Sequence, residues 1–192
     1  MTRFWWVRHG PTHEKAFVGW RDVPADLSDT ARLARLDAHL PKGALIVSSD
    51  LVRASATAAA LADGREALPP DPMIREFNFG LWDGLHWSEA AARDPELTRA
   101  YWETPGDICP PEGESWNAAA ARVDGFEARM LGAHKDRDIV VVAHFGVILT
   151  RIQRATGSTS AEALAHRIEP LSVTCVEFSG TDARVLEIGT CP

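Results

Sequence analysis

The sequence predicts an α/β fold: a three-layer α/β/α arrangement around a mostly parallel central sheet, with a helical excursion over the edge that carries the candidate site. Two continuous apolar runs, Phe4–Val7 and Ile139–Ala143, are typical of strands that are buried on both faces, as in parallel sheets. Strand-like and helix-like segments also alternate between Phe4 and Gly64, which is the order of layered α/β folds. Both observations favour a sheet with helices on each side.

The first part of the chain has the clearest β-α-β-α order. After the first run, residues 27–29 predict the start of a helix that ends near Leu40, before a Pro-Lys-Gly break. A second short strand covers Ala44–Val47. The polar side chains of residues 48–50 are candidate caps for a helix from Leu51 to about Ala62.

Residues 65–138 have a different character. Their local signals are, in chain order, an extended segment over Ile74–Phe79, a helix N-terminus at Asp94-Pro95, a Pro/Gly-rich loop over 104–113, and a helix over Ser115–Leu131 that Gly132 ends. We interpret this stretch as a mostly helical, lid-like excursion. Because no linker-like sequence isolates it, residues 1–192 are expected to form a single domain.

Further elements follow the second apolar run. They are a helix from Gly146 to about Ala155, a capping box at 159–162 before a short helix, and strands over Val173–Phe178 and Ala183–Ile188 joined by a hairpin turn at 179–182.

Composition and charge narrow the classes of function. The 192 residues carry a net charge of −7 and no long cluster of Lys or Arg, which argues against nucleic acids and anionic membrane surfaces as partners. Cys109, Cys175 and Cys191 are odd in number and widely spaced, so neither a disulfide framework nor a thiolate zinc site is expected. Because no secretory leader or membrane-spanning stretch is predicted, we expect a cytoplasmic protein.

A histidine follows each of the two apolar runs. His9 comes after Arg8 at the end of the first run, and His144 directly follows the second. Open α/β sheets build their sites at the carboxyl ends of the strands, so the two imidazoles are expected at one sheet edge. A neutral imidazole can attack phosphorus, which makes His9 a candidate nucleophile. The alternative is a histidine that merely packs at the end of a strand.

Cationic groups and a carboxyl group complete the candidate site. Arg8 and Arg53 are candidate phosphate clamps, because a guanidinium binds phosphate oxygens bidentately and stays protonated. His144 precedes a predicted helix N-terminus, where free backbone N–H groups favour an anion. Glu76, flanked by aromatic residues, is a candidate general acid, although its segment taken alone favours a surface carboxylate.

Four sequence blocks in this order resemble the histidine phosphatase superfamily, the phosphoglycerate mutase-like proteins, and within it the phosphatase branch. The blocks are Arg8–Thr12, Ser48–Ala54 with Thr57-Ala58, Glu76–Gly84 and Val142–Ile148, and Gly113-Glu114-Ser115 looks like a helix start of the family. Each block is moderately specific, and the four in order are highly specific.

The resemblance implies a role for each candidate residue. His9 becomes the phosphohistidine, and Arg8, Arg53 and His144 hold the transferred phosphoryl group. Glu76 gives a proton to the leaving group and then serves as the base for water. The implied activity is that of a metal-independent phosphomonoesterase, without a cofactor, acting on a small phosphorylated metabolite. Dimers are common among related proteins, so a homodimer is a candidate assembly.

Three positions depart from the family pattern. Lys15 stands where the family often has an asparagine that contacts phosphate; its long side chain could replace that contact or point to solvent, and Lys15 and Thr12 are candidate substrate contacts. Phe145 stands where a small residue is usual, and could narrow the phosphate end of the pocket or alter the helix N-terminus. Ala31 replaces a glycine, which should matter for structure alone.

Other functions remain compatible with the sequence. A phosphoglycerate mutase would transfer the phosphoryl group between substrates, and hydrolysis is favoured because mutases of this family are usually longer. A non-catalytic module that binds phosphorylated ligands would keep the fold, and Lys15 and Phe145 keep this alternative open. A His/Glu metal hydrolase is a third alternative, although no histidine spacing in the sequence predicts a metal site.

Overall fold

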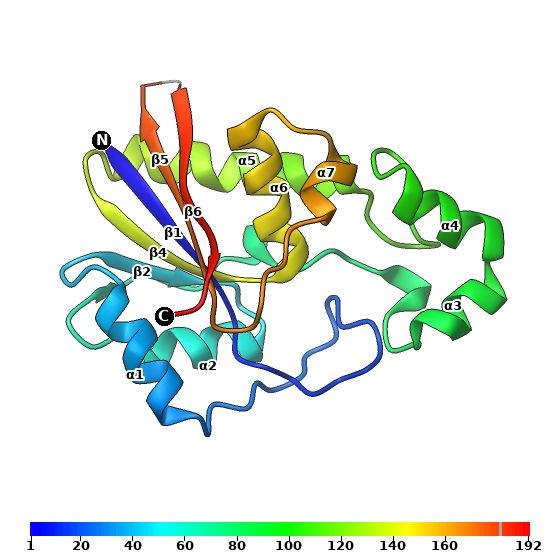
Figure 1. Ribbon diagram of the computed structural model, residues 1–192, viewed down its shortest axis with the longest axis horizontal. Helices are drawn as coiled ribbons and strands as arrows, with labels where there is room; N and C mark the ends of the chain where they lie inside the picture. Colours follow the sequence, from blue (N-terminus) through cyan, green and yellow to red (C-terminus); the bar gives the residue numbers. More distant parts are fainter. Residues whose placement is uncertain (181) are drawn as a thin grey trace.

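A six-stranded sheet lies at the centre of the computed structural model, which describes residues 1–180 and 182–192 (Figure 1). The strands are β1 (Thr2–Arg8), β2 (Leu45–Ser48), β3 (Glu66–Ala67), β4 (Asp138–Ala143), β5 (Val173–Ser179) and β6 (Asp182–Thr190). Their order across the sheet is β3-β2-β4-β1-β5-β6. Strand β5 runs antiparallel to both β1 and β6, and the other neighbouring strands pair in parallel. The predicted mostly parallel sheet is thereby confirmed.

Helices cover both faces of this sheet. The helices of the described residues are α1 (Thr30–His39), α2 (Val52–Ala60), α3 (Trp87–Arg93), α4 (Pro95–Glu103), α5 (Trp116–Ala133), α6 (Phe145–Thr156) and α7 (Ser160–Leu164). Figure 1 shows α1 and α2 on one side of the sheet, α5 and α6 on the other, and α3 and α4 standing beyond its end. The three-layer α/β/α arrangement and the helical excursion agree with the prediction. Among the described residues, no helix combines the length and hydropathy that crossing a membrane requires.

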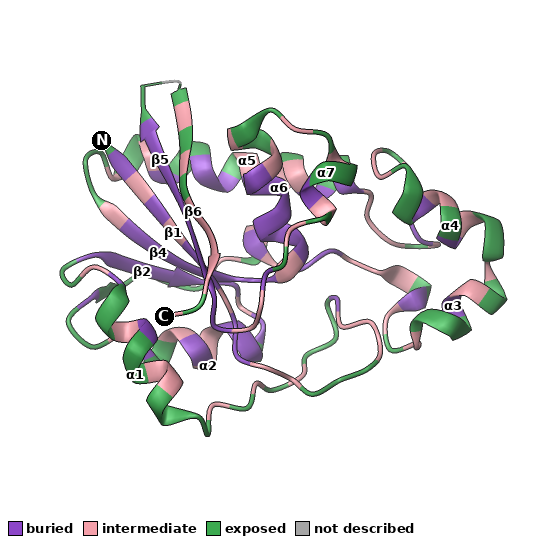
Figure 2. Cartoon of the chain, viewed as in Figure 1, coloured by how far each residue is buried: buried purple, intermediate pink, exposed green. Residues whose placement is uncertain are grey.

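The residues of the central strands alternate between two hydrophobic clusters. Ile139 and Val141 of β4 face the cluster under α5 and α6, whereas Val140 and Val142 face the cluster with α1 and α2. All four side chains are fully buried, and Figure 2 shows β2 buried along its length, whereas β1 has buried and intermediate residues. A continuous apolar run is therefore what a strand with two covered faces requires.

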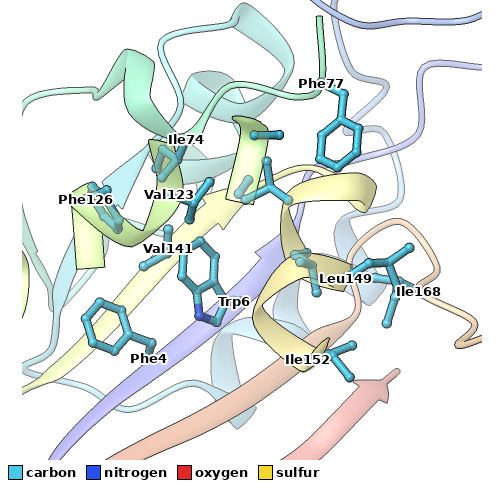
Figure 3. Packing of buried hydrophobic residues seen from close by; sticks show 14 of the residues in the cluster. Phe4, Trp6, Ile74, Phe77, Val123, Phe126, Val141, Leu149, Ile152 and Ile168 are labelled. Carbon is cyan, nitrogen blue, oxygen red and sulfur yellow. The ribbon is translucent and has the colours of Figure 1, made fainter. Parts of the chain in front are cut away.

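Trp6 anchors the larger cluster. Its indole lies 6.1 Å from the ring of Phe4, in a stacked arrangement, and 6.1 Å from the ring of Phe126 on α5. Figure 3 shows Trp6 among Phe4, Val141 and the α6 residues Leu149 and Ile152. This packing fixes the layer formed by α5 and α6 against β1, the strand that ends at the candidate site.

The segment 65–138 is not all excursion. Helix α5 packs on the sheet through Val123 and Phe126, so within this segment α3 and α4 are the helices that stand away from it. Helix α5 also runs past Gly132 to Ala133, against our prediction. A glycine costs a helix interior about 1 kcal/mol, and the buried side chains of α5 outweigh that cost.

The predicted cap of α2 was wrong. Leu51 occupies the N-cap position and its side chain makes no capping hydrogen bond. Asp22, thirty residues earlier, accepts instead from the Val52 N–H through Oδ1 at 2.7 Å. The carboxylate of Asp50 is unavailable because it accepts two hydrogen bonds from Arg75, at 2.7 and 2.5 Å.

Other local predictions had mixed outcomes. The capping box that begins at Thr159 is confirmed, and Asp94-Pro95 does begin α4. The segment predicted as extended begins in a short 3₁₀ turn, Pro72–Ile74. Ser179 and Asp182 pair at the end of β5 and β6, whereas Thr181, within the predicted hairpin turn, lies outside the described residues.

Trp6→Ala should lower the free energy of unfolding by about 3–5 kcal/mol, because the change leaves a large cavity between the sheet and α5. Denaturant unfolding followed by circular dichroism measures it. Trp87→Ala is the matched control: Trp87 is 64% exposed, and its loss should change stability by less than about 0.5 kcal/mol. Equal effects of the two substitutions would contradict the described core.

Candidate active site

The register between β1 and β4 brings the two predicted histidines together. Arg8 pairs with Ala143, so the residues that follow each of them, His9 and His144, leave the sheet side by side. The His9 N–H donates to the Ala143 carbonyl at 3.1 Å, and the two imidazole centroids are 5.1 Å apart. His9 is 6% exposed and His144 is fully buried.

One ring nitrogen of His9 makes a hydrogen bond, and the other makes none with the described residues. Nδ1 lies 2.6 Å from the Gly10 carbonyl oxygen. Because a carbonyl can only accept, Nδ1 carries the proton and Nε2 keeps its lone pair. Burial, together with the positive charges of Arg53 and Arg8, lowers the pKa of His9 to about 3. The imidazole is therefore neutral near pH 7, as a nucleophile must be.

Arg53 lies in the first turn of α2, buried beneath the N-terminal loop. Its guanidinium donates to the carbonyls of Gly19 at 2.6 Å and Arg21 at 3.0 Å. One helical turn later, the Thr57 hydroxyl donates to the Arg53 carbonyl at 2.7 Å and accepts from the Gly10 N–H at 3.0 Å. These bonds tie α2 to the backbone next to His9.

Arg8 approaches from the end of β1. It donates to the Ile168 carbonyl at 2.6 Å, and its guanidinium carbon lies 5.3 Å from the centroid of the Phe145 ring. Burial lowers the pKa of both Arg8 and Arg53, and the nearby Glu76 opposes that shift. An arginine nevertheless stays protonated in proteins, so both carry positive charge.

Several buried polar atoms at this sheet edge have no hydrogen-bond partner among the residues that the structure describes. They are Arg8 Nε, Arg53 Nε and both ring nitrogens of His144. Burial, the repulsion that a protonated His9 would add, and the charge of Arg53 lower the pKa of His144 well below its usual range, which keeps it neutral with one N–H to donate. Buried polar groups are normally paired, so this concentration of donors has the chemistry of an anion site.

Glu76 lies fully inside the protein beside this cluster. Its Oε1 accepts from the Phe77 N–H at 3.0 Å, and the Gly146 N–H donates to both carboxylate oxygens at 3.1 Å. Burial raises the pKa of Glu76, against the effects of these N–H groups and of the two arginines. A Cβ at position 146 would lie 2.7 Å from Oε1, so a larger residue there would displace the carboxyl group from its present position.

The segment that carries Glu76 is held from behind by Arg122 of α5. Its guanidinium donates to the carbonyls of Met73 at 2.6 Å, Arg75 at 2.9 Å and Glu76 at 3.3 Å. It also pairs with both oxygens of Glu114, at 2.9 and 2.8 Å. The Gly113-Glu114-Ser115 block predicted the start of α5, where Ser115 is the N-cap, but not the pairing of Glu114 with Arg122. No local sequence pattern singles out Arg122.

Trp20 contacts the Glu76 segment from its solvent-facing side. Its indole N–H donates to the Glu76 carbonyl at 2.8 Å, and the Arg75 guanidinium lies over its ring at 5.0 Å. The backbone of the candidate acid is thus fixed from two directions, although Trp20 itself is 39% exposed.

The remaining predicted contacts are less well supported. Thr12 is half-buried and Lys15 is exposed, and in the part of the chain that the structure describes neither makes a side-chain hydrogen bond or ion pair. Their roles in binding remain predictions. Phe145 lies against Arg8 and also lines a pocket beside Glu76. Its ring thus separates that pocket from the cluster formed by His9, His144, Arg8 and Arg53, the phosphate cluster.

An aromatic pocket with a cavity volume of about 40 Å³ adjoins Glu76. Its lining comes from the Glu76 segment, α4, the N-terminal end of α5, α6 and α7, and includes Phe77, Phe79, Tyr101, Trp102, Trp116 and Phe145. Within the described ranges, 1–180 and 182–192, no group of three His, Cys, Asp or Glu side chains is arranged to hold a metal ion.

Comparison with known proteins identifies the family. The model of the histidine phosphatase superfamily (branch 1) matches residues 4–190. The chain belongs to this superfamily. Its match to a bifunctional protein of Mycobacterium tuberculosis is 34% identical over 163 residues, covering 84% of this chain and 42% of that protein. The chain thus spans less than half the length of the first curated relatives it matches.

Other members of the superfamily match along most of their length. The adenosylcobalamin/alpha-ribazole phosphatase of Escherichia coli is 30% identical over 171 residues, covering 85% of this chain and 83% of the relative. The structure of Bacillus stearothermophilus YhfR superposes with a TM-score of 0.91 at 24% identity, covering 100% and 98% of the two chains. That of a mycobacterial glucosyl-3-phosphoglycerate phosphatase superposes with a TM-score of 0.84 at 26% identity, covering 99% of each chain.

The burial of His9 predicts a pH-dependent stability. Its folded pKa lies below its unfolded value of about 6.5, so between about pH 6.5 and about pH 3 the unfolded chain binds the extra proton. Stability is therefore complete above this window and is lost as the pH falls through it. His9→Asn should remove part of this loss, about 2 kcal/mol between about pH 6.5 and pH 4.5.

Urea unfolding at a series of pH values measures this slope. His166→Asn is a suitable control, because the His166 side chain makes no hydrogen bond or ion pair among the described residues. The control should keep the wild-type slope. A slope that is identical in wild type and His9→Asn would show that folding does not lower the pKa of His9.

Proposed function

We propose that this protein is a phosphomonoesterase that hydrolyses a small phosphorylated metabolite through a phosphohistidine on His9, with Glu76 as general acid and then general base. The observation that carries the proposal is the free Nε2 of a buried imidazole beside the buried Arg53, the half-buried Arg8 and a second imidazole. The names of the superfamily and of the alpha-ribazole phosphatase relative support the same class of reaction.

Binding of the phosphoryl group uses the donors that have no protein partner. A phosphate dianion at the sheet edge accepts hydrogen bonds from Arg8 and Arg53, which also neutralise its charge, and from the N–H of His144. The local charge matters because the chain as a whole has a net charge of −7 and repels anions.

The first step transfers the phosphoryl group to the protein. The lone pair of His9 Nε2 attacks phosphorus, and the bond between phosphorus and the ester oxygen breaks. The departing oxygen takes the proton of Glu76 and leaves as an alcohol. The raised pKa of Glu76 keeps that proton available at a pH where an ordinary glutamate has lost it.

The second step returns the protein to its starting state. A water molecule attacks the phosphohistidine, and the carboxylate of Glu76 removes a proton from it. The bond between Nε2 and phosphorus breaks, which releases inorganic phosphate and leaves Glu76 protonated and His9 neutral. The arginines and His144 stabilise charge on the phosphoryl oxygens in both steps, the role that a metal ion plays in other phosphatases.

Rapid quenching with a phosphorus-labelled substrate should trap label on His9 that is stable in base and lost in acid. Activity should persist in a metal chelator, and His9→Ala should lose label and turnover together, by about 10⁴-fold or more. Label on another residue, or full activity of His9→Ala, would refute the proposal.

The same experiment separates the alternatives. Transfer of the label to added 3-phosphoglycerate, in preference to water, would identify a mutase. Phosphate binding without turnover across a panel of phosphomonoesters would identify a non-catalytic binding module.

Glu76→Gln tests the proton donor. It should slow kcat/KM for butyl phosphate by about 10²–10⁴-fold, because an alkoxide needs protonation. The loss should be much smaller for p-nitrophenyl phosphate, whose leaving group is stable as an anion. For butyl phosphate, wild-type kcat/KM should also fall as the pH rises through the elevated pKa of Glu76. Equal losses for both substrates would exclude general-acid catalysis by Glu76.

A further inference from the structure

The pocket beside Glu76 is built to hold something apolar. Aromatic rings from four different parts of the chain line it: Phe77 and Phe79 from the Glu76 segment, Trp102 from α4, Trp116 from the start of α5, and Phe145 from α6. The rings are braced by edge contacts, with 5.5 Å between the centroids of Phe77 and Trp116 and 4.9 Å between those of Tyr101 and Trp102. The walls are therefore fixed by packing.

Glu76 lies at the junction of this pocket and the phosphate cluster. Its carboxyl group belongs to the pocket lining, and the Arg8 and Arg53 charges act on it from the other side. Because the leaving oxygen must reach Glu76, the alcohol part of a phosphomonoester extends from the phosphate cluster into the pocket. The pocket lining therefore contacts the leaving group.

The charge of the lining restricts that leaving group. Among the described residues that line the pocket, Glu76 and Tyr101 are the ionisable ones, and none is a lysine, arginine or histidine. A carboxylate on the substrate would lie near Glu76 without a cation to pair with, and burying an unpaired charge is costly. An ammonium group would lack an ionised carboxylate as its partner in this lining while Glu76 holds the proton that the proposed reaction needs.

Tyr101 also lines the pocket and carries a polar hydroxyl group. The Tyr101 side chain is 4% exposed, and its hydroxyl is buried with no hydrogen-bond partner. Burial and the charge of Glu76 raise the pKa of this hydroxyl, so it stays protonated and can donate. Buried tyrosine hydroxyls usually have a partner, and within this pocket a ligand group can supply one.

We infer that the substrate is the phosphate ester of an uncharged alcohol bearing an aromatic ring, and that a polar group on the ring meets the Tyr101 hydroxyl. The inference rests on the proposed function and adds the chemical class of the leaving group.

A comparison of primary alcohol phosphates tests the ring. The four compounds are phenethyl phosphate, butyl phosphate, phosphoserine and 3-phosphoglycerate. Each has an alkoxide as its leaving group, so differences in rate do not come from the higher reactivity of aryl phosphates. We expect kcat/KM for phenethyl phosphate to exceed that for each of the other three by about tenfold or more, from burial of the ring. Equal or higher kcat/KM for phosphoserine or 3-phosphoglycerate would overturn the inference.

Tyr101→Phe tests the polar contact. The substitution removes a buried hydroxyl that has no protein partner, so the fold should be retained. Of the ortho, meta and para hydroxyphenethyl phosphates, at least one should be a better substrate than phenethyl phosphate. That advantage, measured as the ratio of the two kcat/KM values, should fall by about three- to tenfold in Tyr101→Phe. If no hydroxyphenethyl isomer loses its advantage over phenethyl phosphate in Tyr101→Phe, the Tyr101 hydroxyl does not bind the substrate.

The two levels of the proposal fail differently. If wild type hydrolyses none of these esters and forms no phosphohistidine, the proposed function fails. If wild type forms phosphohistidine on His9 but prefers a charged ester, the phosphatase stands and the inferred leaving-group class is wrong.

Discussion

The in-register pairing of β1 with β4 is the constraint on which the site depends. Because Arg8 lies opposite Ala143, the next residue of each strand is a histidine, and the two imidazoles leave the sheet 5.1 Å apart. A shift of one residue would turn each strand over and exchange the side chains that face its two hydrophobic clusters. The packing of the core therefore protects the geometry of the site.

Burial then sets the protonation states. Desolvation disfavours any charged form, so it lowers the pKa of His9 and raises that of Glu76. The guanidiniums of Arg8 and Arg53 keep their charge because their intrinsic pKa is so high. Under the proposed function, this one physical effect favours a neutral nucleophile and a protonated acid beside two cations that can bind a phosphate dianion.

Local sequence patterns predicted the sheet and the meeting of His9 with His144, because strand ends and apolar runs are local features. They favoured a surface position for Glu76, and the family resemblance was needed to place it in the site. Contacts between distant segments escaped prediction: Asp22 capping α2, and Arg122 holding the Glu76 segment. No local pattern encodes which remote side chain reaches a given backbone group. The same holds for the pocket, whose walls come from five separate segments.

The most direct test of this account is a crystal structure of the protein with orthovanadate, which mimics a phosphoryl group in transfer. We expect vanadium bonded to His9 Nε2, its oxygens accepting hydrogen bonds from Arg8, Arg53 and His144, and Glu76 next to the apical oxygen that faces the aromatic pocket. Vanadate bound away from His9, or bound there without the arginines, would contradict the account.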